Sequence, residues 1–202
     1  MNKIEETKEL MEMKAETAGV ILPNLSTVMN GTLKTRLLDI IKDNVALFKA
    51  IGVITPAFLN DNFAPWELTS SGVFVSGTHT TTCHRIIVCG DAVVQSLGET
   101  DSYCFDNAKL EGQGGTHRLY NYAELNLTDE AVVWAYNNSK VNAASHAVVI
   151  VHDQADVYNT DNVVIVRPTP QVSTKPPYKT VEEGKAHYRR LASQNWLMED
   201  DF

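Results

Sequence analysis

Between residues 123 and 166, small and apolar residues follow a pattern that repeats every eight positions. The first, third and fifth positions of a unit are mostly small or aliphatic, whereas the seventh and eighth are polar, often Asp or Asn. Side chains alternate across a strand, so the first, third and fifth residues share one side. Short polar side chains favour tight turns. Each unit therefore predicts one short strand followed by a corner, and the array predicts a solenoid.

The second and fourth positions indicate how many units form one coil. They are polar in the units that begin at residues 123, 139 and 155, and apolar in the units between them. In a triangular coil of three units, polar and apolar outward positions would be mixed on every face. In a coil of two units, polar units stack on polar units and apolar units stack on apolar units. We therefore predict a flattened, two-sided parallel β-solenoid of about 16 residues per coil, mainly β with α-helical caps. Its predicted core positions are Leu125, Val133, Val141, Val149, Val157 and Ile165.

The repeat continues towards the N-terminus with lower regularity, through units that begin at Ala108, Thr100 and Ala92. One residue is missing from the register between Gly112 and Gly115. Roughly five coils spaced by about 4.8 Å predict a rod of about 24 Å. The pattern resembles octapeptide arrays of bacterial and phage-encoded proteins, over about 75 residues of this chain. Such a likeness between repeats implies the fold and no activity.

Outside the repeat, the pattern predicts mainly helices. We expect a helical anchor or cap over residues 1–60, a transition over 61–83, the solenoid over 84–167, a Pro-rich linker over 168–179, and a C-terminal helix with an acidic tail over 180–202. The expected N-terminal helices cover residues 2–17, residues 33–51 and a short segment that begins at Thr55 and Pro56. The helical regions are placed to cap the solenoid, whose unpaired end strands invite pairing with other chains.

The first strand is expected at Val73–Val75, and Pro65 and Trp66 are expected to pack over the open end of the solenoid. No run of residues is long and apolar enough to span a membrane, and the charged start lacks the features of a secretory signal. Three cysteines are too few for a disulfide framework. We expect synthesis in the cytoplasm, with a virion as a further location, and no membrane partner.

The net charge of −8 is unevenly distributed. Residues 91–166 contain eleven acidic and three basic residues, and the rest of the chain contains fourteen of each. An acidic rod repels the nucleic-acid backbone, so we expect no direct binding to it. The residues expected to form an acidic face are Glu124, Asp129, Asp153, Asp156 and Asp161.

The apolar outward positions predict an interface. These six residues, here named the apolar strip, are Val132, Trp134, Val148, Ile150, Val164 and Val166. Exposed together they would form a patch of several hundred Å², which soluble monomers rarely tolerate. Either the chain's own helices cover the strip, with the helix that carries Trp196 folding back, or identical chains pack strip against strip.

The residues that could carry chemistry form no convincing site. The soft metal ligands are His79, Cys83, His84, Cys89, Cys104 and His117, and their spacing matches no zinc-binding pattern. His146 and His152 lie near Asp153, but turn chemistry explains them equally well. Units of constant length leave no long loops for a catalytic pocket. We therefore predict no catalytic residues, no metal and no cofactor.

Two functions from different classes are compatible with these patterns. The preferred one is a non-enzymatic structural or interaction protein that assembles or docks through the apolar strip, with a protein partner and a homo-oligomer or larger assembly. By analogy with phage fibres, decorations and attachment proteins, a virion component is the expected setting. The alternative is an acidic mimic of nucleic acid that inhibits a DNA-binding protein. A carbohydrate-active β-helix is a weaker third option, because it requires an acidic groove fed by loops.

Overall fold

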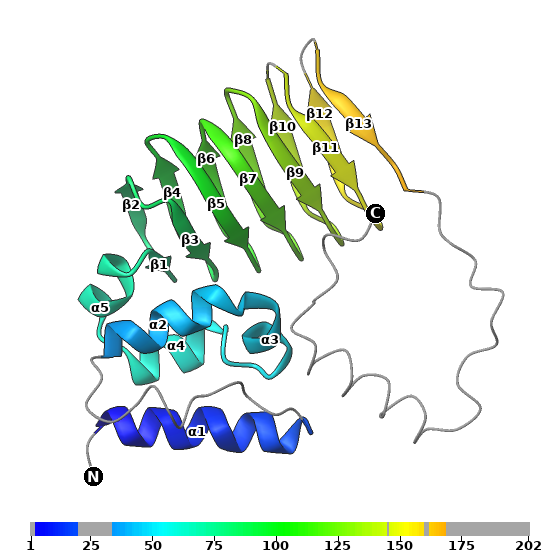
Figure 1. The fold of residues 1–202 in the computed structure, drawn as a ribbon. Helices are drawn as coiled ribbons and strands as arrows, with labels where there is room; N and C mark the ends of the chain where they lie inside the picture. Colours follow the sequence, from blue (N-terminus) through cyan, green and yellow to red (C-terminus); the bar gives the residue numbers. More distant parts are fainter. Residues whose placement is uncertain (1–2, 20–33, 145, 160–161, 169–202) are drawn as a thin grey trace, which may run out of the picture. The chain divides into compact units, whose positions relative to one another are not determined.

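The computed structural model describes residues 3–19, 34–144, 146–159 and 162–168. The described residues divide into two compact units, one that comprises residues 3–19 and 34–54 and one that comprises residues 55–144, 146–159 and 162–168. The second unit contains the solenoid (Figure 1). The expected linker, apart from Pro168, and the expected C-terminal helix lie outside the described residues.

The first unit contains α1 (Lys3–Thr17), α2 (Lys34–Asp43) and α3 (Val45–Ala50). The helix expected over residues 2–17 is confirmed. The helix expected over residues 33–51 is interrupted at Asn44, which leaves the helical region with φ −135°. Its side-chain Nδ2 donates a hydrogen bond to the carbonyl oxygen of Ile40 at 3.0 Å. An Asn side chain that bonds to a helix carbonyl competes with the backbone N–H groups and favours a break in the helix. The apolar residues keep their helical spacing across Asn44, so the spacing alone does not reveal this break.

Two short helices precede the first strand of the solenoid. In α4 (Pro56–Asn62), the Thr55 hydroxyl accepts a hydrogen bond from the Phe58 amide at 3.2 Å, as the sequence predicts. The next helix, α5 (Pro65–Ser70), contacts β1 (Val73–Phe74). Trp66 is 67% exposed, so the expectation that it packs over the end of the solenoid is wrong. The buried side of this helix carries Leu68 instead.

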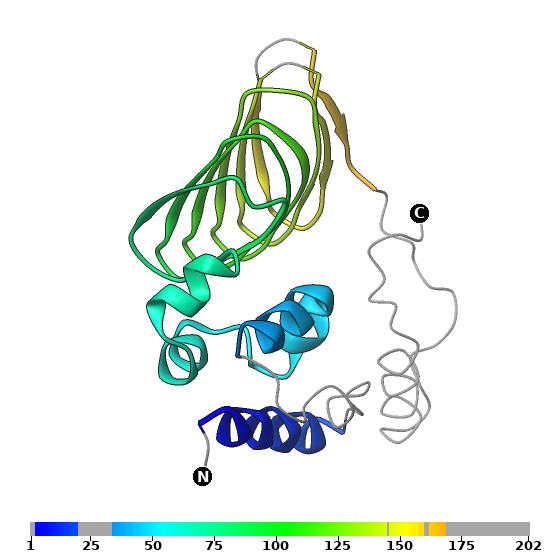
Figure 2. The same ribbon diagram turned by 60° about the vertical axis from the view of Figure 1, so that its left-hand side comes forward.

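The described part of the solenoid consists of two parallel sheets (Figures 1 and 2). The seven-stranded sheet contains β1, β3 (Arg85–Val88), β5 (Glu99–Cys104), β7 (Gly114–Leu119), β9 (Ala131–Ala135), β11 (Val148–Val151) and β13 (Val164–Val166). The six-stranded sheet contains β2 (Thr78–Thr81), β4 (Val93–Ser96), β6 (Lys109–Gly112), β8 (Glu124–Leu127), β10 (Lys140–Ala143) and β12 (Asp156–Asn159). The chain alternates between the sheets, which confirms the flattened two-sided coil of about 16 residues.

The solenoid is longer than expected, with about six coils instead of five. The additional coil is formed by β1 and β2, within the segment expected to be a transition. Val73 pairs with Ile87, and Thr78 pairs with Val93, so this coil joins both sheets at their first strands. Its segments lack the Ala, Val and Asp or Asn pattern of the later units, which explains why the repeat did not reveal it.

The residue missing near Gly112–Gly115 shortens one coil. Lys109 pairs with Glu124, fifteen residues ahead, whereas Glu124 pairs with Lys140 at the usual sixteen. Gly115 absorbs the change with φ +103°, and a Cβ atom there would clash with the Thr100 carbonyl oxygen. Only glycine fits this position without displacement of the neighbouring backbone.

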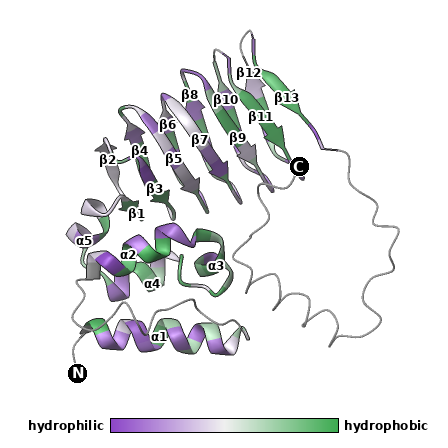
Figure 3. Ribbon diagram, in the orientation of Figure 1, coloured by the Kyte–Doolittle hydropathy of each residue, from purple (hydrophilic) through white to green (hydrophobic). Residues whose placement is uncertain are grey.

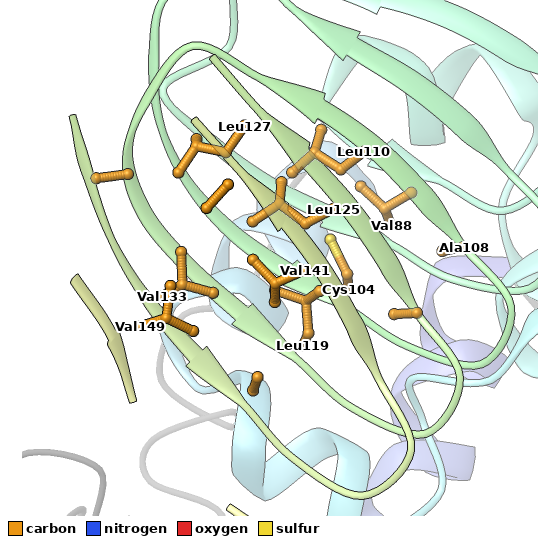
Figure 4. Packing of buried hydrophobic residues seen from close by; sticks show 14 of the residues in the cluster. Val88, Cys104, Ala108, Leu110, Leu119, Leu125, Leu127, Val133, Val141 and Val149 are labelled. Carbon is orange, nitrogen blue, oxygen red and sulfur yellow. The ribbon is translucent and has the colours of Figure 1, made fainter. Parts of the chain in front are cut away.

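Inward side chains from both sheets meet in one core (Figure 4). The expected core residues with no exposed surface are Leu125, Val133, Val141 and Val149. Val157 is only partly buried, and Ile165 is 38% exposed, so the prediction of burial is wrong for Ile165. Both lie in the last described coil, where the described residues provide a neighbouring coil on one side only.

One corner of the coil is held by two stacks of side chains. Asp106, Asn121, Asn137 and Asp153 all have positive φ, between 52° and 62°. The backbone N–H of Asn137 donates to Asp153 Oδ2, sixteen residues ahead, at an N···O distance of 3.0 Å. Beside them, the rings of Phe105, Tyr120, Tyr136 and His152 stack at centroid distances of 5.0, 4.9 and 4.5 Å. These stacks satisfy corner backbone groups and fix the register from coil to coil.

Candidate interaction surfaces

The apolar strip lies on the outer face of the seven-stranded sheet, in two rows. Cα pairing aligns Val132, Val148 and Val164 in one row and Trp134, Ile150 and Val166 in the other. Val164 is 56% exposed and Val166 is 41% exposed, and the remaining four side chains are partly exposed. The apolar character of β11 and β13 is visible in Figure 3. Sequence and structure thus place all six residues on one surface.

A polar border adjoins the strip. The guanidinium carbon of Arg118 lies 4.9 Å from the ring centroid of Tyr103 and 5.1 Å from that of Trp134. Arg118 Nη1 also donates to Asp101 Oδ1 at 2.9 Å, and Arg85 Nε lies 3.4 Å from Asp101 Oδ2. The aromatic rings and the carboxylate hold the arginine against the sheet, since guanidinium groups stack on aromatic faces. Sequence reasoning missed this border because Tyr103 and Arg118 align only across the shortened coil.

The expected acidic residues do not form one face. Glu124 lies on the six-stranded sheet, 2.8 Å from Lys109 Nζ and 3.6 Å from Lys140 Nζ. The hydrogen bond from Lys109 is the main reason that the pKa of Glu124 is lowered. Asp156 is the Cα partner of Lys140 in the next coil. The second position of the polar units holds a lysine in one coil and an acidic residue in the next. Positive and negative charges therefore alternate along this row.

The other acidic residues lie at corners. Asp129 follows β8, whereas Asp153 follows β11, so the two occupy opposite corners of the flattened coil. Asp161 lies outside the described residues. The seventh position of the unit alternates between the two corners in a coil of two units, which explains why a regular spacing of Asp does not produce one acidic face.

A buried polar pair lies inside the coil. The Ser102 hydroxyl and His117 Nδ1 are 2.8 Å apart, and His117 has no exposed surface. A Cβ atom at Gly112 would lie 3.2 Å from His117 Nε2, so the imidazole fills the space beside this glycine. Burial lowers the pKa of His117 to about 4 and raises the pKa of the Cys104 thiol to about 12. The Ser–His pair is therefore enclosed in the core, and the strand periodicity that places residue 117 inward could have revealed it.

The other soft ligands are distributed along the first coils. His79 Nε2 lies 2.8 Å from the Ser76 carbonyl oxygen, and its ring packs 5.0 Å from that of Phe74. Cys89 is buried, whereas His84 is exposed. Among the residues that the structure describes, no three His, Cys, Asp or Glu side chains gather closely enough to hold a metal ion.

A shallow groove of about 330 Å³ lies on the outer face of the six-stranded sheet. Its lining residues are Asn126, Leu127, Thr128, Asn142, Ala143, Ala144 and Tyr158. The groove follows the ends of β8, β10 and β12. The sequence contained a signal for it, because the fourth position of the polar units holds Asn, Asn and Tyr in succession.

Comparison with known proteins found no matching family model, no matching curated protein and no matching solved structure. Within the described ranges, no helix combines the length and the apolar character needed to cross a membrane. The apolar strip and the groove are therefore the features from which a function can be inferred.

Proposed function

We propose that this chain is a non-enzymatic structural or interaction protein that assembles through the apolar strip, with a second copy of itself as the partner. The observation that carries the proposal is the alignment of six apolar side chains in two outward rows on three successive coils. A virion of a phage or mobile element is the setting that we propose, and it rests on the repeat resemblance alone.

The geometry favours a contact between the apolar strips of two identical chains. Two identical faces related by a two-fold axis bring each row against an apolar row of the partner, which is a self-complementary arrangement. Full burial of each Val or Ile contributes about 1.5–3 kcal/mol, and partly covered side chains contribute less. The strip offers a few hundred Å², below the roughly 800 Å² per partner of a standard stable interface. We therefore expect reversible association, with a dissociation constant on the order of 10 µM.

The border beside the strip supports an oriented contact. Arg118 and Asp101 place charge at the end of the strip nearer to β5, whereas Val164 and Val166 end it on β13. If the partner chain were shifted towards the border, it would bury Arg118 and Asp101 without forming new hydrogen bonds to them. Burial of charged groups in this way costs free energy. The border thus limits the contact to the three apolar coils.

Sedimentation equilibrium of the full chain from about 1 to 200 µM tests the proposal. The average mass should rise with concentration for the wild-type chain and stay monomeric for Ile150→Asp. The matched control is Asn142→Asp, which adds a carboxylate at the equivalent outward position of the opposite sheet. The proposal fails if the wild-type chain is monomeric throughout, or if both variants reduce the mass equally.

The alternative, an acidic mimic of nucleic acid, has less support. Such a mimic requires carboxylates in a regular row on one surface. Two lysines bind Glu124, and Asp129 and Asp153 lie at opposite corners. No observation on the described residues favours this function over assembly.

A further inference from the structure

The groove lies on the six-stranded sheet, whereas the apolar strip lies on the seven-stranded sheet. Asn126, Asn142 and Tyr158 occupy the same outward position in three successive coils and are Cα partners. The groove volume of about 330 Å³ is at the lower end of the range for small-molecule sites.

The two amides leave hydrogen-bonding groups available to a ligand. Asn142 Nδ2 donates to Asn126 Oδ1 at 2.7 Å, and no other side-chain hydrogen bond of either residue occurs within the described part of the chain. Each amide has two N–H donors and a carbonyl acceptor. The Nδ2 donors of Asn126 and the Oδ1 acceptor of Asn142 therefore remain available. This combination suits a ligand whose hydroxyl groups both donate and accept.

Tyr158 supplies an aromatic surface beside the amides. It is 58% exposed, so part of its ring is open to a ligand. The remaining lining residues are Leu127, Thr128, Ala143 and Ala144. An apolar ring face next to neutral polar groups matches the two chemical sides of a pyranose ring.

The charges near the groove favour a neutral ligand. Lys140 lies beside Asn142 in the next outward position of β10, with Glu124 and Asp156 as its Cα partners on the two neighbouring strands. Positive and negative groups therefore compensate each other along this row. The chain's net charge of −8 opposes a polyanion such as nucleic acid.

We propose that this groove binds a neutral sugar residue of a glycan, with the ring face against Tyr158 and hydroxyl groups hydrogen-bonded to Asn126 and Asn142. This site goes beyond the proposed assembly function and does not depend on it. An open groove with one aromatic wall predicts weak binding, with a dissociation constant on the order of 1–10 mM for a single sugar.

Nuclear magnetic resonance of the full ¹⁵N-labelled chain tests the proposal. The probes are the methyl glycosides of glucose, galactose, mannose and N-acetylglucosamine, each titrated to about 20 mM, with adenosine as a separate probe. At least one glycoside should shift the side-chain amide signals of Asn126 and Asn142 in a saturable way. Tyr158→Ala should weaken this binding at least tenfold.

The matched control is Tyr122→Ala, because Tyr122 is 63% exposed but lies at a corner away from the groove. Binding should be unchanged in this variant. A second variant, Asn126→Ala, removes one exposed amide and should weaken binding severalfold with unchanged backbone signals. The proposal is overturned if no glycoside shifts these signals, if Tyr158→Ala binds as well as wild type, or if adenosine alone binds.

Discussion

Ile150 lies directly beside Trp134 on the neighbouring coil, although the two are sixteen residues apart in the chain. The inward neighbour of Ile150, Val149, pairs with the buried Val133 in the same two strands. One residue of difference in the sequence therefore separates a core position from a surface position. This relationship makes the fold and the proposed interface separable by experiment.

Substitution of these adjacent residues should have opposite effects on folding and assembly. Val149→Asp places a carboxylate in the core without a partner and should cost more than about 4 kcal/mol in the free energy of unfolding. Ile150→Asp should change this free energy by less than about 1 kcal/mol, because its carboxylate reaches water. Urea denaturation followed by circular dichroism measures both. Similar destabilisation by the two variants would contradict the assignment of the faces.

Gly115 should tolerate no side chain. In Gly115→Ala the new Cβ would clash with the Thr100 carbonyl oxygen, so the shortened coil must shift. We expect a loss of about 3 kcal/mol or more in the free energy of unfolding. Gly98→Ala is the matched control, since Gly98 also has positive φ but no atom within 4 Å of its Cβ position. Its cost should be about 1 kcal/mol, from the backbone conformation alone. Equal costs would show that backbone conformation alone, and not crowding, requires glycine at 115.

Stability should fall in acid because of His117. The folded pKa of about 4 lies below the ordinary value of 6.5, so protonation favours the unfolded chain. The stabilisation is present above pH 6.5 and is lost progressively as the pH falls towards 4. At pH 5 the loss from this group should be about 2 kcal/mol relative to pH 8.

The difference between wild type and His117→Gln isolates the effect, because the remaining histidines are present in both chains. Urea denaturation at pH 8 and pH 5 should show a smaller loss of stability for the variant. An equal loss in both chains would mean that His117 is not the group that titrates.

The eight-residue pattern predicts a large part of the fold for a physical reason. In a parallel solenoid each residue repeats the environment of the residue one coil earlier, so inward and outward positions show directly in the sequence. This relationship predicts the core positions Leu125 and Val141, the rows of the apolar strip, and the shortened coil near Gly112. In the structure, Gly115 accommodates the missing residue with φ +103°.

Features that depend on neighbours outside the repeat could not be predicted. The first coil was predicted only in part, because the strand expected at Val73–Val75 is present as β1, whereas β2 lacks the eight-residue pattern. Arg118 meets Tyr103 only after the one-residue slip is applied, and Ile165 lies in the last described coil, where the described residues cover it from one side only. At the helix break, the Asn44 side chain donates a hydrogen bond to the Ile40 carbonyl oxygen, and the apolar spacing gives no sign of this bond. Each of these features depends on local contacts, which the eight-residue spacing does not predict.

The most direct test of assembly through the apolar strip is the accessibility of Trp134 itself. In a Trp66→Phe, Trp196→Phe chain, Trp134 is the single tryptophan, and acrylamide quenching of its fluorescence reports its exposure. We predict that the quenching constant falls severalfold as the protein concentration rises through the range in which the mass increases, and that Ile150→Asp abolishes this fall. A quenching constant that stays the same while the mass increases would contradict the account, because the chains would then associate through another surface.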